Sequence, residues 1–358
     1  MNSLKMMTAA FLFGTQVSPS AIERIFHQKN ITPSKALGYT NPANLKMASV
    51  QLEPREYNSL GQYIDHMEEM VRQAADGGAQ MVCFPEYTGL LPLMISPTLR
   101  ETAKSAVSAL FTAQPFDKEH FIQVFRDYLS GPLFNCYYNT FSLLADHYQL
   151  YIQAGSTLIY THGELRERSF LFSPEGETIL EQDKLSLSPM DCTLGITPGT
   201  ELEIASTPLG KISVLVGEDS SRFEPSKLAH ALGAQVLICP AAPTLSENIA
   251  PYLCGAFMRC QEFPAFAVVS CLVGQVGGCQ FYGRSGLFGP YEAARLPSGV
   301  CSQAENHTRT TVTVGRINLE RLHSAFNLYT SDTNPAIYAK LEKAYRNLSD
   351  FDNTPQEP

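Results

Sequence analysis

The chain has 358 residues, of which 44% are hydrophobic and 17% are charged. This composition is too apolar for a disordered protein and supplies enough apolar side chains for a large core, so we expect a globular protein. The net charge is −9, and the basic residues are scattered along the chain, which argues against nucleic acid as a partner. A small molecule or another protein is the expected partner.

The cysteines and the N-terminal residues bear on the cellular compartment. The nine cysteines are odd in number, lie mostly in apolar runs and show no zinc-like spacing, so we expect reduced thiols, no metal and no cofactor. The apolar run near the N-terminus is short and interrupted by polar residues, unlike a signal peptide. No segment approaches the ~20 apolar residues of a membrane span. These features indicate a cytoplasmic protein without a membrane segment.

The first half of the chain predicts alternating strands and helices. Residues 1–44 are polar and are interpreted as an extension with one short helix, from Ala21 to Gln28. The segment "LKMASVQLEP" predicts a strand, and "LGQYIDHMEEMVRQAADGGAQ" carries apolar residues at helical spacing before Gly77 and Gly78. The continuous apolar run in "MVCFPE" is typical of a strand covered on both faces. Strand, helix and strand together predict a layered α/β fold.

The second half continues this alternation. Residues 91–131 are interpreted as a helical insertion, "FSLLADHYQLYIQAGSTL" as a helix and a strand, and "RSFLFSPEGETILEQDKLSL" as a hairpin. The segments "KISVLVGED" and "SKLAHALGAQVLICPAA" repeat the strand and helix pattern. We therefore predict one domain over residues 45–316, followed by a helical C-terminal arm over 317–358.

Three features stand at the ends of predicted strands: Glu86 in "CFPEY", Lys184 in "EQDKLSLSP", and the turn Gly217-Glu218-Asp219. Layered α/β sheets build their sites at strand ends, because the rigid sheet positions the loop side chains there. Taken alone, each residue has a plainer interpretation as a solvated loop acid or a surface lysine. Their shared placement favours a common site.

Further segments carry a family resemblance. They are "MASVQL", "FPEYTG", "DKLSLSP", "TPGTE", "RFEP", "ALGAQVLICPAAP", "RCQE" and "GRSGLFGP". In this order and rough spacing, the chain from Leu45 to about Arg316 resembles the nitrilase superfamily of carbon-nitrogen hydrolases. The resemblance implies a four-layer-forming αββα sandwich of the α/β class, whose subunits associate, which makes a homodimer the expected oligomer.

The resemblance also implies a chemistry. Members of this family cleave amide or nitrile carbon-nitrogen bonds with a Glu base, a Lys and a Cys nucleophile, often with a second Glu. The cysteine attacks as a thiolate and needs a base, while the lysine stabilises the developing oxyanion. The resemblance makes Glu86 the base and Lys184 the oxyanion stabiliser. Asp191 would stand near the second acid, with a side chain one methylene shorter.

The nucleophile is where the chain departs from the family pattern. Alignment of "KISVLVGED" puts Gly217 at the cysteine position, Glu218 where the oxyanion-hole amide comes from, and Asp219 on the acidic position. A shifted register based on Arg222 would put Glu218 at the nucleophile position instead, and would spoil the strand match. Neither alignment supplies a cysteine.

Three other residues near the turn carry a hydroxyl or a thiol. Ser220 and Ser221 follow in the turn and are expected several ångströms from the cysteine position at Gly217. Their plainer role is to cap the following helix. Cys192 lies beside Asp191 but on a different loop, and is more simply a small apolar residue.

Three hypotheses follow. In the first, the chain is a homologue that has lost thiol catalysis and binds a small amide or carboxylate ligand. In the second, it is an active amidase-type hydrolase that uses another nucleophile or a water activated by Glu86 or Glu218. In the third, it is a non-catalytic dimeric scaffold.

Overall fold

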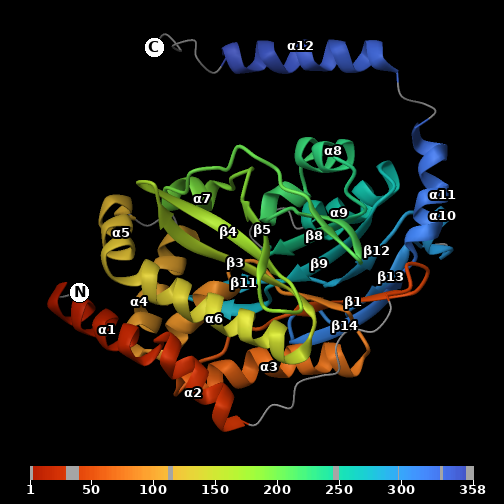
Figure 1. The fold of residues 1–358 in the computed structure, drawn as a ribbon. Coiled ribbons are helices and arrows are strands. Elements are labelled where there is room, and N and C mark those ends of the chain that lie inside the picture. The colour runs from red at the N-terminus through yellow and green to blue at the C-terminus, as the bar shows by residue number, and fades with distance from the viewer. Residues whose placement is uncertain are drawn as a thin grey trace.

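The computed structural model describes residues 3–29, 40–111, 116–244, 250–296, 298–330 and 334–351 (Figure 1). Within these residues the chain forms two six-stranded sheets. In spatial order the first consists of β14 (Thr311–Ile317), β1 (Leu45–Gln51), β2 (Met81–Cys83), β3 (Tyr151–Thr161), β4 (Glu164–Phe172) and β5 (Thr178–Asp183). The second consists of β13 (Val300–Gln303), β12 (Gly286–Phe288), β9 (Phe266–Cys271), β8 (Val236–Ala241), β7 (Gly210–Val214) and β6 (Ala205–Thr207).

The central strands of each sheet are parallel, and they determine where the site lies. Strands β1, β2 and β3 run parallel in the first sheet, and β7, β8 and β9 do so in the second. Every residue of β8 and β9 is buried, as expected for parallel strands covered on both faces. The predicted hairpin is confirmed, because β4 and β5 pair antiparallel around the turn at Pro174-Glu175-Gly176.

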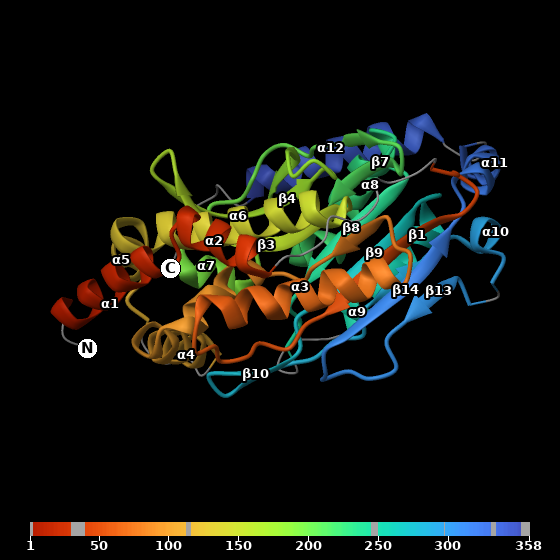
Figure 2. The same cartoon turned by 60° about the horizontal axis from the view of Figure 1, so that its bottom comes forward.

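The two sheets are stacked, with helices on both outer faces. Buried side chains of both sheets, such as Met47 and Met81 of the first and Val214 and Ile238 of the second, form one apolar cluster between them. Helices α3 (Leu60–Asp76) and α6 (Ser130–Tyr148) lie side by side over the first sheet (Figure 2). Helices α8 (Phe223–Ala231) and α9 (Ala250–Glu262) lie on the opposite side of the sandwich. The predicted αββα layering is confirmed.

Helix α3 shows how the sequence sets an element boundary. Ser59 caps its first turn by accepting a hydrogen bond from the Gln62 N–H at 3.2 Å. The helix ends before Gly77, where a Cβ atom would lie only 2.7 Å from Val314 Cγ2 of β14. The glycine therefore lets the helix end pack against the sheet, and the predicted helix and its stop are confirmed.

The N-terminal segment is more ordered than predicted. It forms two helices, α1 (Ser3–Gln16) and α2 (Pro19–Lys29), where the sequence predicts one short helix. Ala10, Phe13 and Val17 of this segment are buried in the core that α3 and α6 share. Their spacing of three and four residues is helical, but the exposed apolar residues Phe11 and Leu12 between them obscure it. Residues 30–39 of the predicted extension lie outside the described residues.

The predicted insertion is helical in its described part, although residues 112–115 lie outside it. It contains the 3-10 helix η1 (Thr88–Ile95), α4 (Pro97–Phe111), α5 (Lys118–Val124) and a π-helical turn η2 (Phe125–Leu129). Other short elements are α7 (Pro189–Leu194), the 3-10 turn η3 (Gly217–Ser220), α10 (Tyr291–Ala294) and the hairpin β10 (Gly274–Val276) with β11 (Cys279–Phe281).

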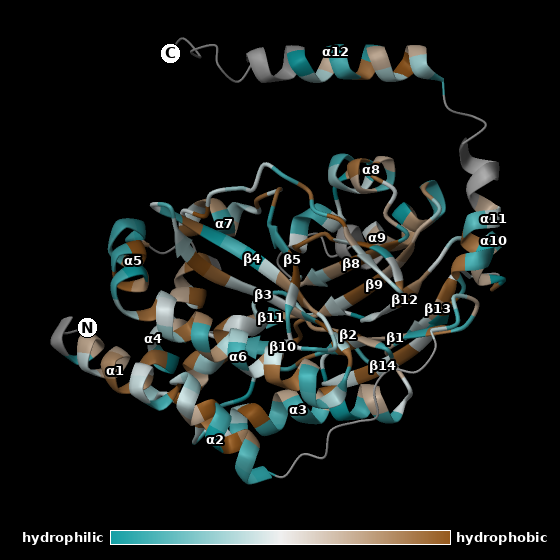
Figure 3. Cartoon of the chain, in the orientation of Figure 1, coloured by the Kyte–Doolittle hydropathy of each residue, from teal (hydrophilic) through white to brown (hydrophobic). Residues whose placement is uncertain are grey.

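The C-terminal arm consists of α11 (Leu319–Thr330) and α12 (Pro335–Phe351). Helix α12 stands apart from the layered body in Figure 1, although the Tyr345 hydroxyl donates a hydrogen bond to Glu224 of α8 at 2.5 Å. The central strands are apolar and the outer helices alternate in hydropathy (Figure 3). In the described part of the chain, we find no helix with both the length and the apolarity required to cross a membrane.

Candidate functional site

Four charged side chains converge beyond the ends of β2 and β5. Lys184 Nζ lies 2.7 Å from Glu86 Oε1, 2.7 Å from Asp191 Oδ2 and 3.2 Å from Glu167 Oε2. No side chain of this group is more than 5% exposed. The structure thus brings together Glu86, Lys184 and Asp191, all singled out from the sequence, and adds Glu167, which sequence reasoning missed. We refer to these four residues as the Lys184 cluster.

Glu86 is held by a tight turn that follows β2. Tyr87 has a left-handed backbone with φ 60°, and its N–H donates to Ser156 Oγ at 2.9 Å. The Thr88 hydroxyl closes the turn by donating to the Pro85 carbonyl at 2.7 Å. Because an uncommon backbone conformation persists only where neighbouring contacts fix it, this turn sets the direction of Glu86 firmly.

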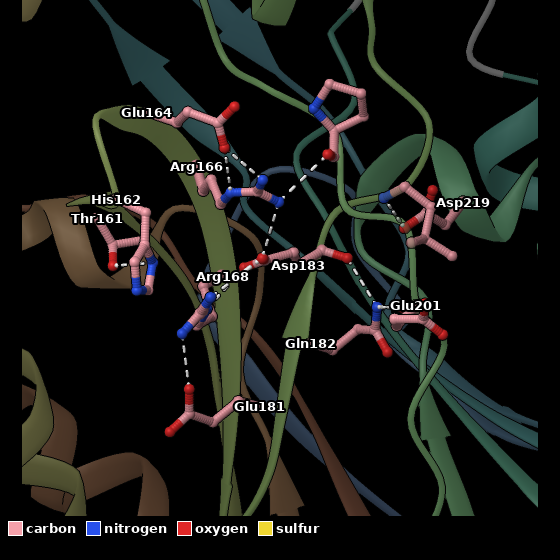
Figure 4. A network of polar contacts seen from close by, with 12 residues as sticks. Thr161, His162, Glu164, Arg166, Arg168, Glu181, Gln182, Asp183, Glu201 and Asp219 are labelled. Carbon is pink, nitrogen blue, oxygen red and sulfur yellow. Dashed lines mark hydrogen bonds and ion pairs between the residues drawn. The ribbon is translucent and has the colours of Figure 1, made fainter.

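Lys184 and Glu167 are neighbours across the β4–β5 hairpin. Lys184 directly follows β5, and its backbone N–H donates to the Glu167 carbonyl at 2.9 Å. On β4, Arg166 and Arg168 flank Glu167 and both bond Asp183 on the opposite face of the strand (Figure 4). Side chains alternate between the faces of a strand, so Glu167 points inward to the lysine. This alternation in "ELRERSF" is the signal that could have identified Glu167.

Asp191 reaches the lysine because of its place in α7. It forms a capping box with Ser188: the Ser188 N–H donates to Asp191 Oδ2 at 2.7 Å, and the Asp191 N–H donates to Ser188 Oγ at 3.2 Å. The Tyr87 hydroxyl donates to its other oxygen at 2.9 Å. The shorter side chain is compensated by a helix start that projects it directly toward Lys184.

The Gly217 turn lies against this cluster. Gly217 has φ +53°, and a Cβ atom there would lie 2.1 Å from Glu86 Oε1 and 2.9 Å from Lys184 Nζ. The glycine therefore allows the Glu86 carboxylate and the turn to occupy adjoining space.

The two acids that follow Gly217 have different surroundings. Asp219 is buried and accepts hydrogen bonds from the backbone N–H groups of Leu185, at 3.0 Å, and Ser186, at 2.5 Å. It therefore positions the loop that carries Lys184. The Glu218 carboxylate accepts a hydrogen bond from Ser221 at 3.0 Å and lies 3.4 Å from Arg222 Nε, so these contacts tie it to its own turn.

Comparison with known proteins identifies the family. The family model for carbon-nitrogen hydrolases matches residues 46–324. This chain belongs to the carbon-nitrogen hydrolase family. Among curated proteins, the chain is 23% identical over 289 residues to the probable hydrolase YhcX of Bacillus subtilis (strain 168), which covers 79% of this chain and 52% of that protein. The chain thus spans about half the length of that relative.

Solved amidase structures show the same fold as this carbon-nitrogen hydrolase chain. A cysteine-to-serine mutant of the Nesterenkonia AN1 amidase from the nitrilase superfamily is 17% identical, with a TM-score of 0.59, over 84% of this chain and 98% of that one. A glutamate-to-glutamine mutant of the amidase from Nesterenkonia sp. AN1, with acrylamide added at its active-site cysteine, is 16% identical with a TM-score of 0.59, over 83% and 99%. At such identities the similarity establishes the shared fold.

The electrostatics of this hydrolase-family cluster follow from three acids around one base. Burial lowers the pKa of Lys184, but Glu167, Glu86 and Asp191 together outweigh it and raise that pKa well above its ordinary value. Burial also raises the pKa of Glu86 well above its usual range, with a further contribution from the neighbouring acids against the opposing effect of Lys184. Burial likewise raises the pKa of Glu167. The lysine therefore stays charged, while Glu86 and Glu167 hold a proton to higher pH than in water.

The other hydroxyl groups near the turn have local roles. The Ser220 and Ser221 hydroxyls donate to the carbonyls of Gly217 and Glu218, both at 2.9 Å, and so close their own 3-10 turn. The expectation that they cap α8 is wrong, because Arg222 is its N-cap residue and supplies no side-chain cap.

The cysteines near the strand ends are not activated. Burial raises the pKa of Cys83 well above its usual range, and raises that of Cys271 to about 11. Cys192, next to Asp191, is exposed. Among the described residues, no group of three or more His, Cys, Asp and Glu is arranged to hold a metal ion.

Proposed function

We propose that this chain binds a small amide at the Lys184 cluster and lacks thiol catalysis, with Gly217 at the nucleophile position of its family. The observation that carries this proposal is the contact between Gly217 and Glu86. A side chain at position 217 would start 2.1 Å from Glu86 Oε1, so the acid lies where a nucleophile at that turn would project. Loss of a nucleophile alone can reduce a catalytic rate about a million-fold.

The cluster is chemically suited to an amide. In this proposal the Lys184 N–H that faces Glu167, its longest contact at 3.2 Å, donates instead to the amide oxygen. The Glu86 carboxylate accepts a hydrogen bond from the amide nitrogen. These are the two groups that would act as oxyanion stabiliser and base in an active enzyme. Asp191 and Asp219 are positioning residues, because the first bonds Lys184 at 2.7 Å and the second holds the loop at Leu185 and Ser186.

The decisive experiment measures binding and turnover separately. Isothermal titration with acetamide and propanamide is expected to show binding to the unaltered protein, and Glu86→Gln is expected to weaken it. An ammonia-release assay over a panel of short amides and nitriles is expected to show no turnover above background. Turnover that Glu86→Gln abolishes would establish an active amidase that uses another nucleophile or an activated water, and would overturn the proposal.

Restoring the thiol gives an independent test of the site. Gly217→Cys places Sγ beside Glu86, whose flexible carboxylate must move to admit it. We expect a thiol that iodoacetamide alkylates and slow amide turnover that depends on Glu86. Gly217→Ala is the matched control, since it adds the same Cβ without sulfur, and should show neither property. Absence of alkylation and turnover in the folded Cys variant would count against a retained binding site.

We also propose a homodimer formed through the outer helices. Leu228 of α8 and Leu232, which caps its C-terminal end, are 46% and 47% exposed, and Met258 of α9 is 47% exposed. Helix α12 adds further exposed apolar side chains, namely Ile337, Tyr338, Leu341 and Tyr345. Sedimentation velocity should show a dimer that the double change Leu228→Glu and Leu232→Glu weakens. A dimer that binds no amide would favour the hypothesis of a non-catalytic scaffold over amide binding. A protein that stays monomeric at high concentration would refute this interface.

A cytoplasmic location remains part of the proposal. It is supported by the eight cysteines whose side chains are described, none of which forms a disulfide, as expected in a reducing compartment. Fractionation of expressing cells is the direct test.

A further inference from the structure

An apolar chamber lies next to the Lys184 cluster. It has a volume of about 620 Å³, within the range of roughly 300–1,000 Å³ that is typical of small-molecule sites. Most of its lining is apolar and comes from η1, α4, α5, η2 and the β10–β11 hairpin, for example Leu91, Leu99, Leu110, Phe121 and Phe281. The predicted insertion thus forms much of the wall of this chamber.

Tyr87 joins the chamber to the cluster. Its side chain lines the chamber, its hydroxyl donates to Asp191 at 2.9 Å, and its ring centre lies 5.9 Å from Lys184 Nζ. Met190 and Leu194 of α7 also line the chamber, and Asp191 lies between them on the same short helix. The chamber therefore begins where the polar cluster ends.

The covering helices leave apolar side chains partly exposed. Ala103, Ala106, Val107 and Leu110 recur at helical spacing on α4 and line the chamber, yet each is only half-buried. Helix α5 contains no fully buried residue, although Phe121 and Val124 line the same space. Apolar surface left accessible in this way favours an apolar occupant, because its burial removes both surfaces from water.

The covering segment also contains an unusual backbone feature. Between α5 and α6 the chain forms the π-helical turn η2, from which Phe125 and Leu129 line the chamber. Single π-helical turns within helices are rare and frequently occur at functional sites. This turn places two more apolar side chains on the chamber wall.

We propose that the chamber binds the apolar chain of an amide whose polar end lies at the Lys184 cluster. The expected ligand class is therefore an amide with an extended alkyl or aryl group, which should bind more tightly than a short amide such as acetamide. This inference rests on the proposed amide binding, and it adds that Tyr87 marks the boundary between the two parts of the ligand.

The test is a chain-length series on the unaltered protein. Isothermal titration is carried out with acetamide, butanamide, hexanamide and octanamide. Each added methylene buried in the chamber should tighten binding roughly fourfold, as transfer from water to an apolar site implies. If acetamide binds but affinity does not rise with chain length, the assignment of the chamber to the apolar chain is overturned and the proposed function stands. Absence of binding by every amide would overturn the proposed function and, with it, this inference.

A variant inside the chamber has a matched control on the same helix. Ala106→Phe fills part of the space and should lower the ratio of octanamide to acetamide affinity roughly tenfold or more, whereas Thr98→Phe, outside the lining, should leave that ratio unchanged. An equal ratio in both variants would overturn the chamber assignment. Glu86→Ala should weaken octanamide binding too, and full octanamide affinity in that variant would show that the chamber acts independently of the cluster and overturn the inference.

Discussion

Replacing Gly217 by alanine tests the contact on which the proposed function depends. A non-glycine residue at φ +53° costs about 1–2 kcal/mol in the left-handed region. The new Cβ would also lie 2.1 Å from Glu86 Oε1, so the carboxylate must leave its position 2.7 Å from Lys184. Losing a hydrogen bond to a charged group costs about 1.5–3 kcal/mol. The expected loss in the free energy of unfolding is therefore about 2.5–5 kcal/mol, measured by urea denaturation.

A control separates the two contributions. Gly163 has φ +85° and no atom within 4 Å of its Cβ position, so Gly163→Ala should cost only the backbone contribution of about 1–2 kcal/mol. In a Glu86→Ala background, Gly217→Ala should likewise lose its excess cost, because the clashing carboxylate is gone. The reasoning is refuted if Gly217→Ala costs no more than Gly163→Ala, or costs the same with and without Glu86.

Three further expectations concern the charged groups and the thiols. Lys184→Met leaves three buried carboxylates without their cation and should destabilise by about 3–5 kcal/mol at about pH 8. In this variant the acids bind more protons in the folded than in the unfolded state, so the loss of stability should become smaller as the pH falls toward about 5. Lys104→Met at the surface should destabilise far less at every pH. Burial raises the pKa of Asp219 to about 6 from the ordinary 3.8, so its contribution to stability is greatest below about pH 4 and falls as pH rises through 6. Asp219→Asn should flatten that slope in urea titrations, and should cost about 1–3 kcal/mol because one backbone N–H loses its acceptor. Cys192 is exposed, so Cys192→Ser should remove a rapidly reacting thiol from a thiol titration with Ellman's reagent.

The sequence was sufficient to predict the strands that carry the site, although it indicated one N-terminal helix where the structure has two. Continuous apolar runs followed by a turn predicted β2 and β7, and those strand ends carry Glu86 and Gly217. The resemblance, not periodicity, then linked these residues to Lys184 and Asp191. Local pattern cannot supply such a link, because the contacts join residues as far apart as Glu86 and Lys184, which are separated by 98 positions in the chain.

Glu167 and Tyr87 show what the sequence left hidden. Glu167 lies among charged residues of β4, and only the hairpin register turns it inward while Arg166 and Arg168 face Asp183. Tyr87 follows Glu86 directly, but its contact with Asp191 depends on a left-handed turn that no tyrosine predicts. The alternation in β4 shows which face Glu167 occupies, but that this face meets Lys184, and that Tyr87 meets Asp191, is decided by tertiary packing.

The cluster and the chamber place the same demand on a ligand, namely that it be uncharged. Lys184 has three N–H donors and already has three carboxylates within 3.2 Å. A carboxylate ligand would bring a further negative charge beside Glu86 and Glu167, whose pKa values burial already raises. Next to one ionised acid of the cluster, two like charges about 4 Å apart repel by about 4 kcal/mol at an effective dielectric constant of about 20. That repulsion corresponds to about a thousandfold in affinity. An amide escapes it, because its N–H groups donate to the same carboxylates. Of the amide and carboxylate ligands that the sequence left open, the charge of the cluster therefore favours the amide.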